Sequence, residues 1–228
     1  MWHKLKQILG IHASDTQDYA DFYQSYLEVY IKPDAQKSIS QQSFVVLDTE
    51  TTGLDINCDN ILSIGAVRIR NNVIDIADSL SIIVKNQQLQ TQDAVAIHGL
   101  VQTDLKGQSE AESITALFKF LGCDIIVGHH IGFDIAMLHK LSRNNGGGDI
   151  KNSVLDTSYL ARRLDHATDP GSLDRKDYTL DKLCSRFGII PKARHTADGD
   201  AFITALLFMK LMHRLSSKGV GTVGQLMK

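Results

Sequence analysis

The sequence predicts an α/β domain built on a mixed β-sheet that is flanked by helices. Three strand-like segments follow one another closely after residue 43, and from residue 109 onward strand-like and helical segments alternate. The chain of 228 residues is 43% apolar and 22% charged, which is ordinary globular composition and excludes a disordered tail or a fibrous repeat. At roughly 150 residues per domain, this length indicates one or two domains, and we expect one full-sized core.

The first 42 residues are predicted to form a helical extension. Two sets of apolar side chains recur there at helical spacing: Trp2, Leu5, Ile8 and Leu9, and then Tyr19, Phe22, Tyr23, Tyr26, Leu27 and Tyr30. Pro33 and the polar residues that follow it end this pattern. We expect the helices to pack on the main domain, while a docking segment for a protein partner or a membrane-surface helix around Trp2 is the alternative.

The main domain, residues 43–218, begins with strands. Residues 44–47 form a continuous apolar run, which is typical of a central strand covered on both faces. Residues 61–69 and 73–84 predict two further strands joined by an Asn-Asn turn, and residues 125–127 predict another buried strand. The expected sheet is therefore mixed.

Helical periodicity predicts the remaining elements of the main domain. Glu110 and Glu112 stand where the first turn of a helix favours negative charge. Three consecutive glycines end a segment predicted to be a flexible loop, residues 144–148, and residues 219–228 are expected to be a short C-terminal tail. The predicted helices span residues 109–121, 133–141, 157–164, 179–187 and 196–215.

Charge and cysteine content exclude several classes of protein. The formal net charge is −2, whereas domains that hold nucleic acid on a broad basic surface usually have a pI above about 9. No segment approaches the roughly 20 apolar residues of a membrane span, and the N-terminus lacks the apolar core of a signal peptide. The three cysteines are widely spaced without a C-x-x-C pair, which predicts neither a disulfide framework nor a zinc site. We expect a cytoplasmic protein.

Two carboxylates follow the first apolar strand in the order Asp48-Thr49-Glu50. Residues i and i+2 of a strand project from the same face, so Asp48 and Glu50 are expected to point together into one site. Adjacent carboxylates repel each other, and a divalent cation between them is a common way to stabilise the pair. Their place directly after four apolar residues predicts a binding site, because buried charge is avoided unless something binds it.

Two later segments carry further candidate residues. Asp134 falls in the first turn of a predicted helix, directly after a buried strand, where α/β proteins tend to build sites. A simple helix-start role for Asp134 is the alternative. His195 and Asp200 are separated by four residues at the start of the long predicted helix. This spacing places the imidazole at the mouth of the helix and the carboxylate about one turn in.

Taken together and in order, these segments resemble the three motifs of the DEDDh (DnaQ-like) 3′-to-5′ exonuclease superfamily. This family includes the proofreading epsilon subunit of bacterial DNA polymerase III. Asp-x-Glu-Thr-Thr-Gly at residues 48–53 matches the first motif, Asp134 the second, and His195 with Asp200 the third. The resemblance extends over most of residues 44–215. His130 is a departure, because the family usually has Asn there.

The resemblance implies a ribonuclease H-like, five-stranded fold and a metal-dependent hydrolase that removes nucleoside 5′-monophosphates from the 3′ end of single-stranded DNA. Four carboxylates suit two hard divalent ions, Mg²⁺ or Mn²⁺. The resemblance implies that Asp48 bridges the two ions, that Glu50 and Asp200 complete one site, and that Asp134 holds the other ion largely through water. His195 is implied as the general base, since imidazole changes its protonation near neutral pH.

The substrate contacts and the biological role stay open at this point. The expected substrate-binding residues surround the first two motifs and an intervening loop: Thr51, Gly53, Leu54, Ile97, His98, Leu100 and Phe133. Core packing is the alternative for Leu54 and Phe133, and Lys192 and Arg194 are expected near flanking phosphates. An exoribonuclease and a non-catalytic nuclease-like scaffold are the competing functions. A polymerase or another protein partner would have to dock through residues 1–42.

Overall fold

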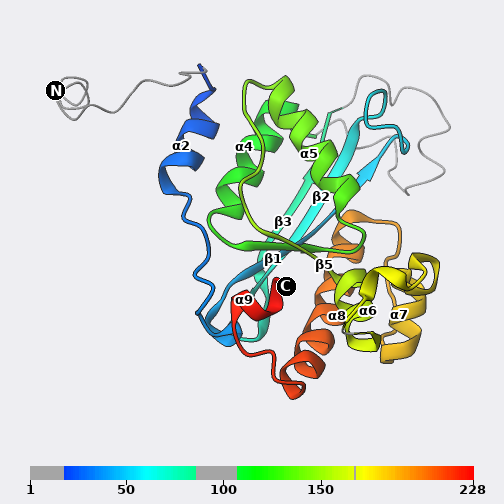
Figure 1. Cartoon of the computed structure of the whole chain (residues 1–228). Helices are drawn as coiled ribbons and strands as arrows, with labels where there is room; N and C mark the ends of the chain where they lie inside the picture. The colour runs from blue at the N-terminus through cyan, green and yellow to red at the C-terminus, as the bar shows by residue number, and fades with distance from the viewer. Residues whose placement is uncertain (1–17, 86–106, 167) are drawn as a thin grey trace, which may run out of the picture.

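The computed structural model describes residues 18–85, 107–166 and 168–228 and confirms the predicted mixed sheet (Figure 1). The strand order is β3-β2-β1-β4-β5, with β1 antiparallel to β2 and parallel to β4. β2 is antiparallel to β3, and β4 is parallel to β5. The five strands span Phe44–Thr51 (β1), Ile61–Arg70 (β2), Val73–Ile83 (β3), Ile125–Gly128 (β4) and Val154–Asp156 (β5).

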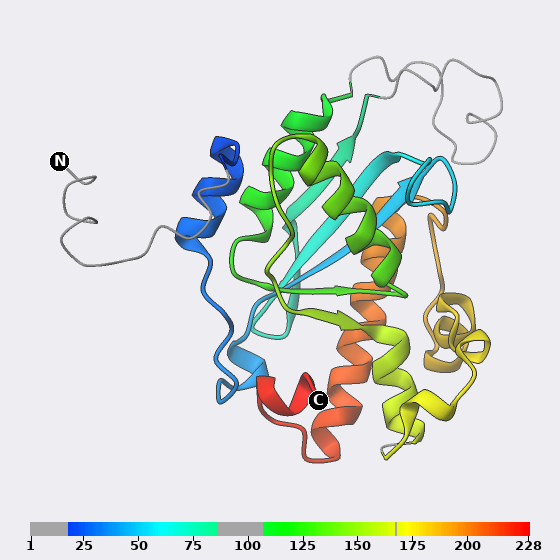
Figure 2. The same ribbon diagram turned by 45° about the horizontal axis from the view of Figure 1, so that its top comes forward.

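Helices cover both faces of this sheet (Figures 1 and 2). Val45 and Leu47 of β1 point into a core shared with the helices of one face, and Phe44 and Val46 point into the core of the other face. The apolar run that begins β1 is thus explained by burial on both sides. The first face carries α4 (Glu110–Leu121) and α5 (Gly132–Asn144), and the second carries α6 (Thr157–Asp165), α7 (Leu180–Phe187) and α8 (Ala197–Ser217).

Most predicted elements agree with the structure to within a few residues at each end. The first strand is longer than its apolar run, because β1 continues to Thr51 and contains both carboxylates of the first motif. Four short helical turns within the described residues were not predicted, since a single turn leaves no periodicity to detect. They are η1 (Ile39–Gln41), η3 (Pro170–Ser172), η4 (Arg175–Tyr178) and α9 (Val223–Leu226). No helix of the described residues is long and apolar enough to cross a bilayer.

The N-terminal helix α2 (Asp21–Val29) packs on the main domain, as expected for the aromatic stripe. The Tyr23 and Tyr26 rings are buried against Phe118 of α4. The Tyr26 hydroxyl donates a hydrogen bond of 2.8 Å to Oδ1 of Asn152. Trp2 and the other residues before 18 lie outside the described part of the chain.

The triple-glycine segment forms the surface that receives α2, rather than the flexible loop that its composition predicts. Gly147 and Gly148 are buried, and a Cβ atom on Gly148 would lie 2.8 Å from the hydroxyl oxygen of Tyr23. The backbone N–H of Ala20 donates to the Gly146 carbonyl at 2.8 Å. The absence of side chains at Gly147 and Gly148 therefore makes room for aromatic rings from a helix more than a hundred residues away in sequence.

Residues 219–228 also pack against the domain, on the segment that precedes β1. The backbone N–H of Val223 donates to the Lys37 carbonyl at 2.9 Å, and the N–H of Ile39 donates to Gly221 at 3.1 Å. Val223 and Leu226 of α9 are buried in the core that lies on the α8 side of the sheet. The C-terminal residues thus hold the segment that leads into β1.

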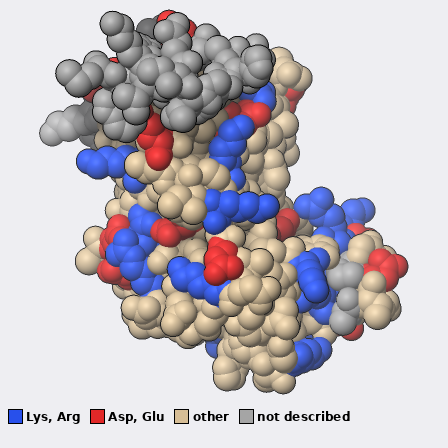
Figure 3. All heavy atoms as spheres, turned by 60° about the vertical axis from the view of Figure 1, so that its left-hand side comes forward, with Lys and Arg blue, Asp and Glu red and all other residues tan. Residues whose placement is uncertain are grey.

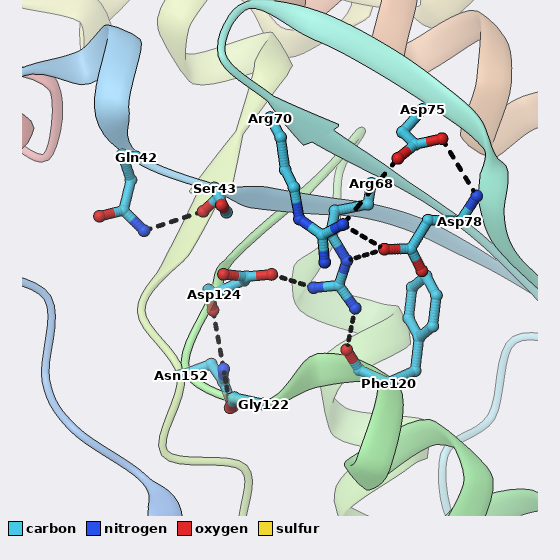
Figure 4. Close-up of polar contacts among 10 residues, drawn as sticks. All are labelled: Gln42, Ser43, Arg68, Arg70, Asp75, Asp78, Phe120, Gly122, Asp124 and Asn152. Atoms are coloured by element: carbon cyan, nitrogen blue, oxygen red, sulfur yellow. Dashed lines mark hydrogen bonds and ion pairs between the residues drawn. The ribbon is translucent and has the colours of Figure 1, made fainter.

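A buried arginine ties the sheet to α4 at the end far from the carboxylates (Figure 4). The side chain of Arg68 in β2 donates to Asp78 at 2.9 Å and to the Phe120 carbonyl at 2.5 Å, and it forms an ion pair with Asp124. Arg68 lies where the register between β2 and β3 shifts. At this shift, the β3 residues between Asp75 and Ser79 have no partner in the ladder, and Arg68 binds one of them, Asp78. Arg70 joins the same cluster through Asp78 at 2.8 Å.

We expect Arg68→Gln to lower the free energy of unfolding by about 3–5 kcal/mol, because it leaves Asp78 and Asp124 without their buried partner. Arg70→Gln is the matched control, since the Arg70 side chain is 48% exposed while that of Arg68 is 9% exposed. We expect Arg70→Gln to cost about 1 kcal/mol or less. Urea unfolding monitored by circular dichroism measures both, and equal losses would contradict the assignment.

Candidate active site

Three carboxylates from two elements meet at the carboxyl end of β1. Asp48 and Glu50 project from the same face of β1, as their spacing predicts, and Asp200 comes from the first turns of α8. One ligand oxygen from each of the three lies within 4.8 Å of the others. Oxygen donors at this separation are suited to a hard divalent cation.

A glycine in β2 lets α8 approach the sheet closely enough to deliver Asp200. Gly65 is the residue directly opposite Asp48 in the β1–β2 ladder. A methyl group on Gly65 would overlap the carbonyl group of Ala197, the first residue of α8. The beginning of α8 therefore rests directly on the β2 backbone, and Asp200 is brought to Asp48.

Asp134 reaches the same end of β1 from the opposite face of the sheet. Its Oδ1 accepts hydrogen bonds from the backbone N–H of Thr49 at 3.0 Å and from the Thr49 hydroxyl at 2.7 Å. Thr49 points toward α5 because side chains alternate along the strand. Asp134 is thus tied to β1, which a simple helix-start role would not require. It is not a member of the group of three within 4.8 Å.

The electrostatics of these carboxylates favour a bound cation. Burial raises the pKa of Asp48 to about 9, and the negative charges of Asp134, Asp200 and Glu50 add to the effect. Burial also raises the pKa of Asp134 to about 6, against the opposing effect of the Thr49 hydrogen bonds. A cation held among these oxygens would reverse both shifts. The donor set and its excess negative charge therefore fit the divalent ions that the sequence predicts.

His195 stands at the mouth of α8, as expected, with its side chain exposed to solvent. Its backbone N–H donates to Oδ2 of Asp200 at 3.3 Å. Both His195 and Ala193 have positive φ angles, +63° and +55°, which are uncommon for residues other than glycine. The next residue, Thr196, caps α8 by accepting a hydrogen bond from the Gly199 N–H at 3.1 Å. The His195 backbone is thus held against Asp200 on a tightly turned segment.

Arg194 has a different place from the one that the sequence predicts. It forms an ion pair with Asp200, and its Nε lies 2.8 Å from Oδ1 of Asp181 in α7. It is therefore committed to two carboxylates rather than positioned for flanking phosphates. No local pattern signals this contact, because Asp181 belongs to another helix.

The second motif contributes two histidines that are hydrogen-bonded to neighbouring elements. Nδ1 of His129 shares a hydrogen bond of 2.9 Å with the Thr157 hydroxyl, and burial lowers the pKa of His129 to about 4. His130, where the family usually has Asn, has a φ angle of +55° and accepts a hydrogen bond of 2.9 Å from Arg175. These contacts join β4 to α6 and η4, and they hold the segment that leads into α5.

The predicted substrate-binding residues divide into three groups. Leu54 follows β1 and is 86% exposed, so core packing is excluded for it, whereas Phe133 is half-buried and packs against the α5 side of the core. The Thr51 hydroxyl donates to the Gly53 carbonyl at 2.7 Å, which shapes the turn after β1. Three further candidates lie outside the described residues: Ile97, His98 and Leu100.

Comparisons with known proteins agree with this geometry. An exonuclease family model, RNase_T, matches residues 45–208. DNA polymerase III subunit epsilon of Aquifex aeolicus is 30% identical over 181 residues, which cover 78% of this chain and 85% of that protein. A PolC-type DNA polymerase III of Thermotoga petrophila is 30% identical over 190 residues, covering 83% of this chain. The chain spans only 13–15% of the first PolC-type relatives.

Solved structures share the fold. E. coli exonuclease I in complex with a dT13 oligonucleotide superposes with a TM-score of 0.64 at 20% identity, over 78% of this chain and 43% of that one. A zinc-bound form of the exonuclease I complex with single-stranded DNA gives a TM-score of 0.62 at 19% identity, over 78% of this chain and 43% of that one. At these identities the likeness establishes the arrangement of strands and helices alone.

The raised pKa of Asp48 predicts how the stability of the metal-free protein depends on pH. The folded protein keeps a proton that the unfolded chain releases near pH 4, so stability falls as pH rises toward about 9. Between pH 7 and 8.5 we expect a loss of about 2 kcal/mol in EDTA, because the folded protein holds one more proton than the unfolded chain over this range. Asp48→Asn should abolish that slope. Thermal unfolding in EDTA measures it, and a flat wild-type profile would refute the prediction.

We expect Gly65→Ala to weaken both folding and cation binding, because the added methyl group displaces the start of α8. Overpacking of this kind costs about 1–3 kcal/mol. Gly171→Ala is the control, since a Cβ atom there would lie 3.5 Å from its nearest neighbour, an ordinary contact. Urea unfolding and calorimetric titration with Mn²⁺ test the pair. Wild-type stability and affinity in Gly65→Ala would show that this contact does not position Asp200.

Proposed function

The chain belongs to the exonuclease family whose model matches residues 45–208, and from this premise we propose that it is a metal-dependent 3′-to-5′ exonuclease. The proposed reaction hydrolyses the phosphodiester bond at the 3′ end of single-stranded DNA and releases nucleoside 5′-monophosphates. The observation that carries the proposal is the meeting of Asp48, Glu50 and Asp200 within 4.8 Å, with Asp134 tied to the same strand. A scaffold protein gains nothing from carboxylates that repel one another at the end of a buried strand.

The proposed cofactors are two divalent cations, Mg²⁺ or Mn²⁺. Asp48, Glu50 and Asp200 would hold them together with Asp134, the fourth carboxylate of the family motifs. When bound, such ions activate a water molecule and stabilise the charge that develops on the phosphate and on the leaving oxygen. His195, exposed at the mouth of α8, would remove the proton of the attacking water as general base. The exposed side chain of His195 gives it access to a substrate that arrives from solvent.

The charge distribution supports a substrate that is held at its end rather than along a duplex. On the face shown in Figure 3, Lys and Arg are interspersed with Asp and Glu and form no broad basic surface on that face, and the formal net charge is −2. Binding would therefore depend on the ions and a few side chains near the scissile phosphate, with little sequence preference. Leu54, exposed directly after the first motif, would contact the terminal nucleotide, and Thr51, Gly53 and Phe133 would line its surroundings.

A protein partner is a further part of the proposal. The similar proteins include a polymerase III epsilon subunit and PolC-type polymerases, and we propose that this chain also works beside a polymerase or in repair. Residues 1–42 remain the proposed contact. Within α2 and the residue pair after it, Tyr23 and Tyr26 are buried, so a partner would meet the exposed Leu27, Val29 and Ile31.

His195→Gln should lower turnover about 10²- to 10⁴-fold, as expected for loss of a general base, while Mn²⁺ binding stays near the wild-type level. Asp48→Asn should lose both binding and cleavage. His213→Gln is the matched control, because His213 is exposed on α8 about five turns from His195. Single-turnover assays and calorimetry provide the two readouts. Wild-type turnover in His195→Gln would remove the histidine from the mechanism.

The same assay identifies the substrate. Matched DNA and RNA oligonucleotides carrying a label at the 5′ or 3′ end are incubated with Mg²⁺, Mn²⁺ or EDTA. We expect a 5′-labelled DNA ladder that shortens from the 3′ end and early release of a 3′ label as mononucleotide. Faster shortening of RNA than of DNA would establish the exoribonuclease alternative. If no substrate is cleaved, the non-catalytic scaffold is the function that remains.

A further inference from the structure

Arg194 connects the metal-ligand candidate Asp200 to a carboxylate outside the site. Its guanidinium forms an ion pair with Oδ1 of Asp200 and contacts both oxygens of Asp181, at 2.8 Å from Nε and 3.4 Å from Nη2. The Arg194 side chain is 21% exposed and that of Asp200 is 10% exposed, so water screens their attraction only partly. This pair is the point where the carboxylate cluster meets a fixed positive charge.

Both oxygens of Asp200 are already engaged in the protein without an ion. Oδ1 is bound by Arg194, and Oδ2 accepts the His195 N–H at 3.3 Å. The same carboxylate is one of the three that lie close enough together to hold a cation. A divalent ion that binds Asp200 must therefore compete with the guanidinium for the charge of this carboxylate.

We propose that Arg194 is a built-in counter-cation that neutralises Asp200 when no divalent ion is bound and exchanges with the ion when one binds. The inference rests on the proposed metal-dependent function, because it assigns the ion to the same carboxylates. Arg194 is a positioning residue in this scheme and takes no part in the chemistry. Its effect is to stabilise the metal-free site and to weaken the affinity for the ion.

Asp181 gives the guanidinium a second carboxylate that stays in place during the exchange. It lies in α7, and its side chain is 65% exposed, so it is not part of the carboxylate cluster. The segment that carries Arg194 is also fixed. A Cβ atom on Gly199 would overlap the carbonyl oxygen of Ala193, so this turn lies directly on the first turn of α8. The guanidinium can therefore shift between two carboxylates without movement of the backbone.

The two ends of this ion-pair chain are expected to act in opposite directions. Arg194→Gln removes the competitor and should tighten Mn²⁺ binding about tenfold, the effect of one charge-assisted hydrogen bond. Asp181→Asn leaves Arg194 with Asp200 as its remaining carboxylate and should weaken binding by several-fold. In the double variant, Asp181→Asn should have no further effect, because the residue through which it acts is absent.

The experiment is calorimetric titration of the whole chain with Mn²⁺, with thermal unfolding in EDTA and at saturating Mn²⁺. Lys192→Gln and Asp177→Asn are the charge-matched controls, since both residues are exposed and Asp177 pairs with Lys182 at 3.0 Å. They report the general effect of removing one charge nearby. Arg194→Gln should lower the melting temperature in EDTA, and it should lower the melting temperature at saturating Mn²⁺ by a smaller amount. A merely structural role would lower the two melting temperatures equally.

Two results would overturn the inference. One is Mn²⁺ affinity in Arg194→Gln that is weaker than, or equal to, that of Lys192→Gln. The other is additivity of the Arg194→Gln and Asp181→Asn effects. Arg194→Lys, which keeps the charge but not the planar fork, should fall between wild type and Arg194→Gln and replaces that variant if it does not fold. A wild-type protein that binds no Mn²⁺ would overturn the proposed function as well. If the wild-type protein binds Mn²⁺ and cleaves DNA, but Arg194→Gln and Asp181→Asn do not change the Mn²⁺ affinity in opposite directions, only the counter-cation role of Arg194 is overturned.

Discussion

Electrostatic repulsion among carboxylates at the end of β1 is the constraint on which the rest of the structure depends. Asp48 and Glu50 cannot separate because they share one face of a buried strand. Asp134 and Asp200 come from helices on opposite faces of the sheet, so each core must be packed firmly enough to hold a charge where it is unfavourable. Gly65 and the Thr49 hydrogen bonds supply the local contacts, and the two cores supply the free energy.

The parts of the chain far from the site act mainly on rigidity. The Arg68 cluster joins β2, β3, α4 and the residue before β4 at the opposite end of the sheet, and α2 covers the segment that follows α5. Sites that hold repelling groups need such support, because a looser scaffold would let the carboxylates move apart. The N-terminal extension therefore contributes to the same domain as the motifs, at least through α2.

The features that depend on the local order of residues along the chain could be predicted from the sequence. The features that depend on contacts between elements distant in the sequence could not. Alternation in β1, the helix after β4 and the motif spacing are local, so the sheet, the helices and the four candidate carboxylates could be predicted. The Arg194–Asp181 contact, the need for Gly65 opposite Asp48 and the docking of Tyr23 on Gly148 depend on which elements become neighbours. Glycine composition alone favoured flexibility at residues 144–148, and packing decided otherwise.

The small net charge of −2 conceals how unevenly charge is placed. Negative charge is concentrated at the carboxyl end of β1. In the protein without ions, two effects reduce this charge: burial and repulsion raise the pKa of Asp48 so that it keeps a proton, and Arg194 forms an ion pair with Asp200. Divalent ions would replace both the proton and the guanidinium, since the ions compete with the proton at Asp48 and with the guanidinium at Asp200. Because proton, arginine and metal ion draw on the same excess of negative charge, ion affinity should depend jointly on pH and on Arg194. The negative charge that first argues against a nucleic-acid enzyme is thus the charge that would bind the proposed ions.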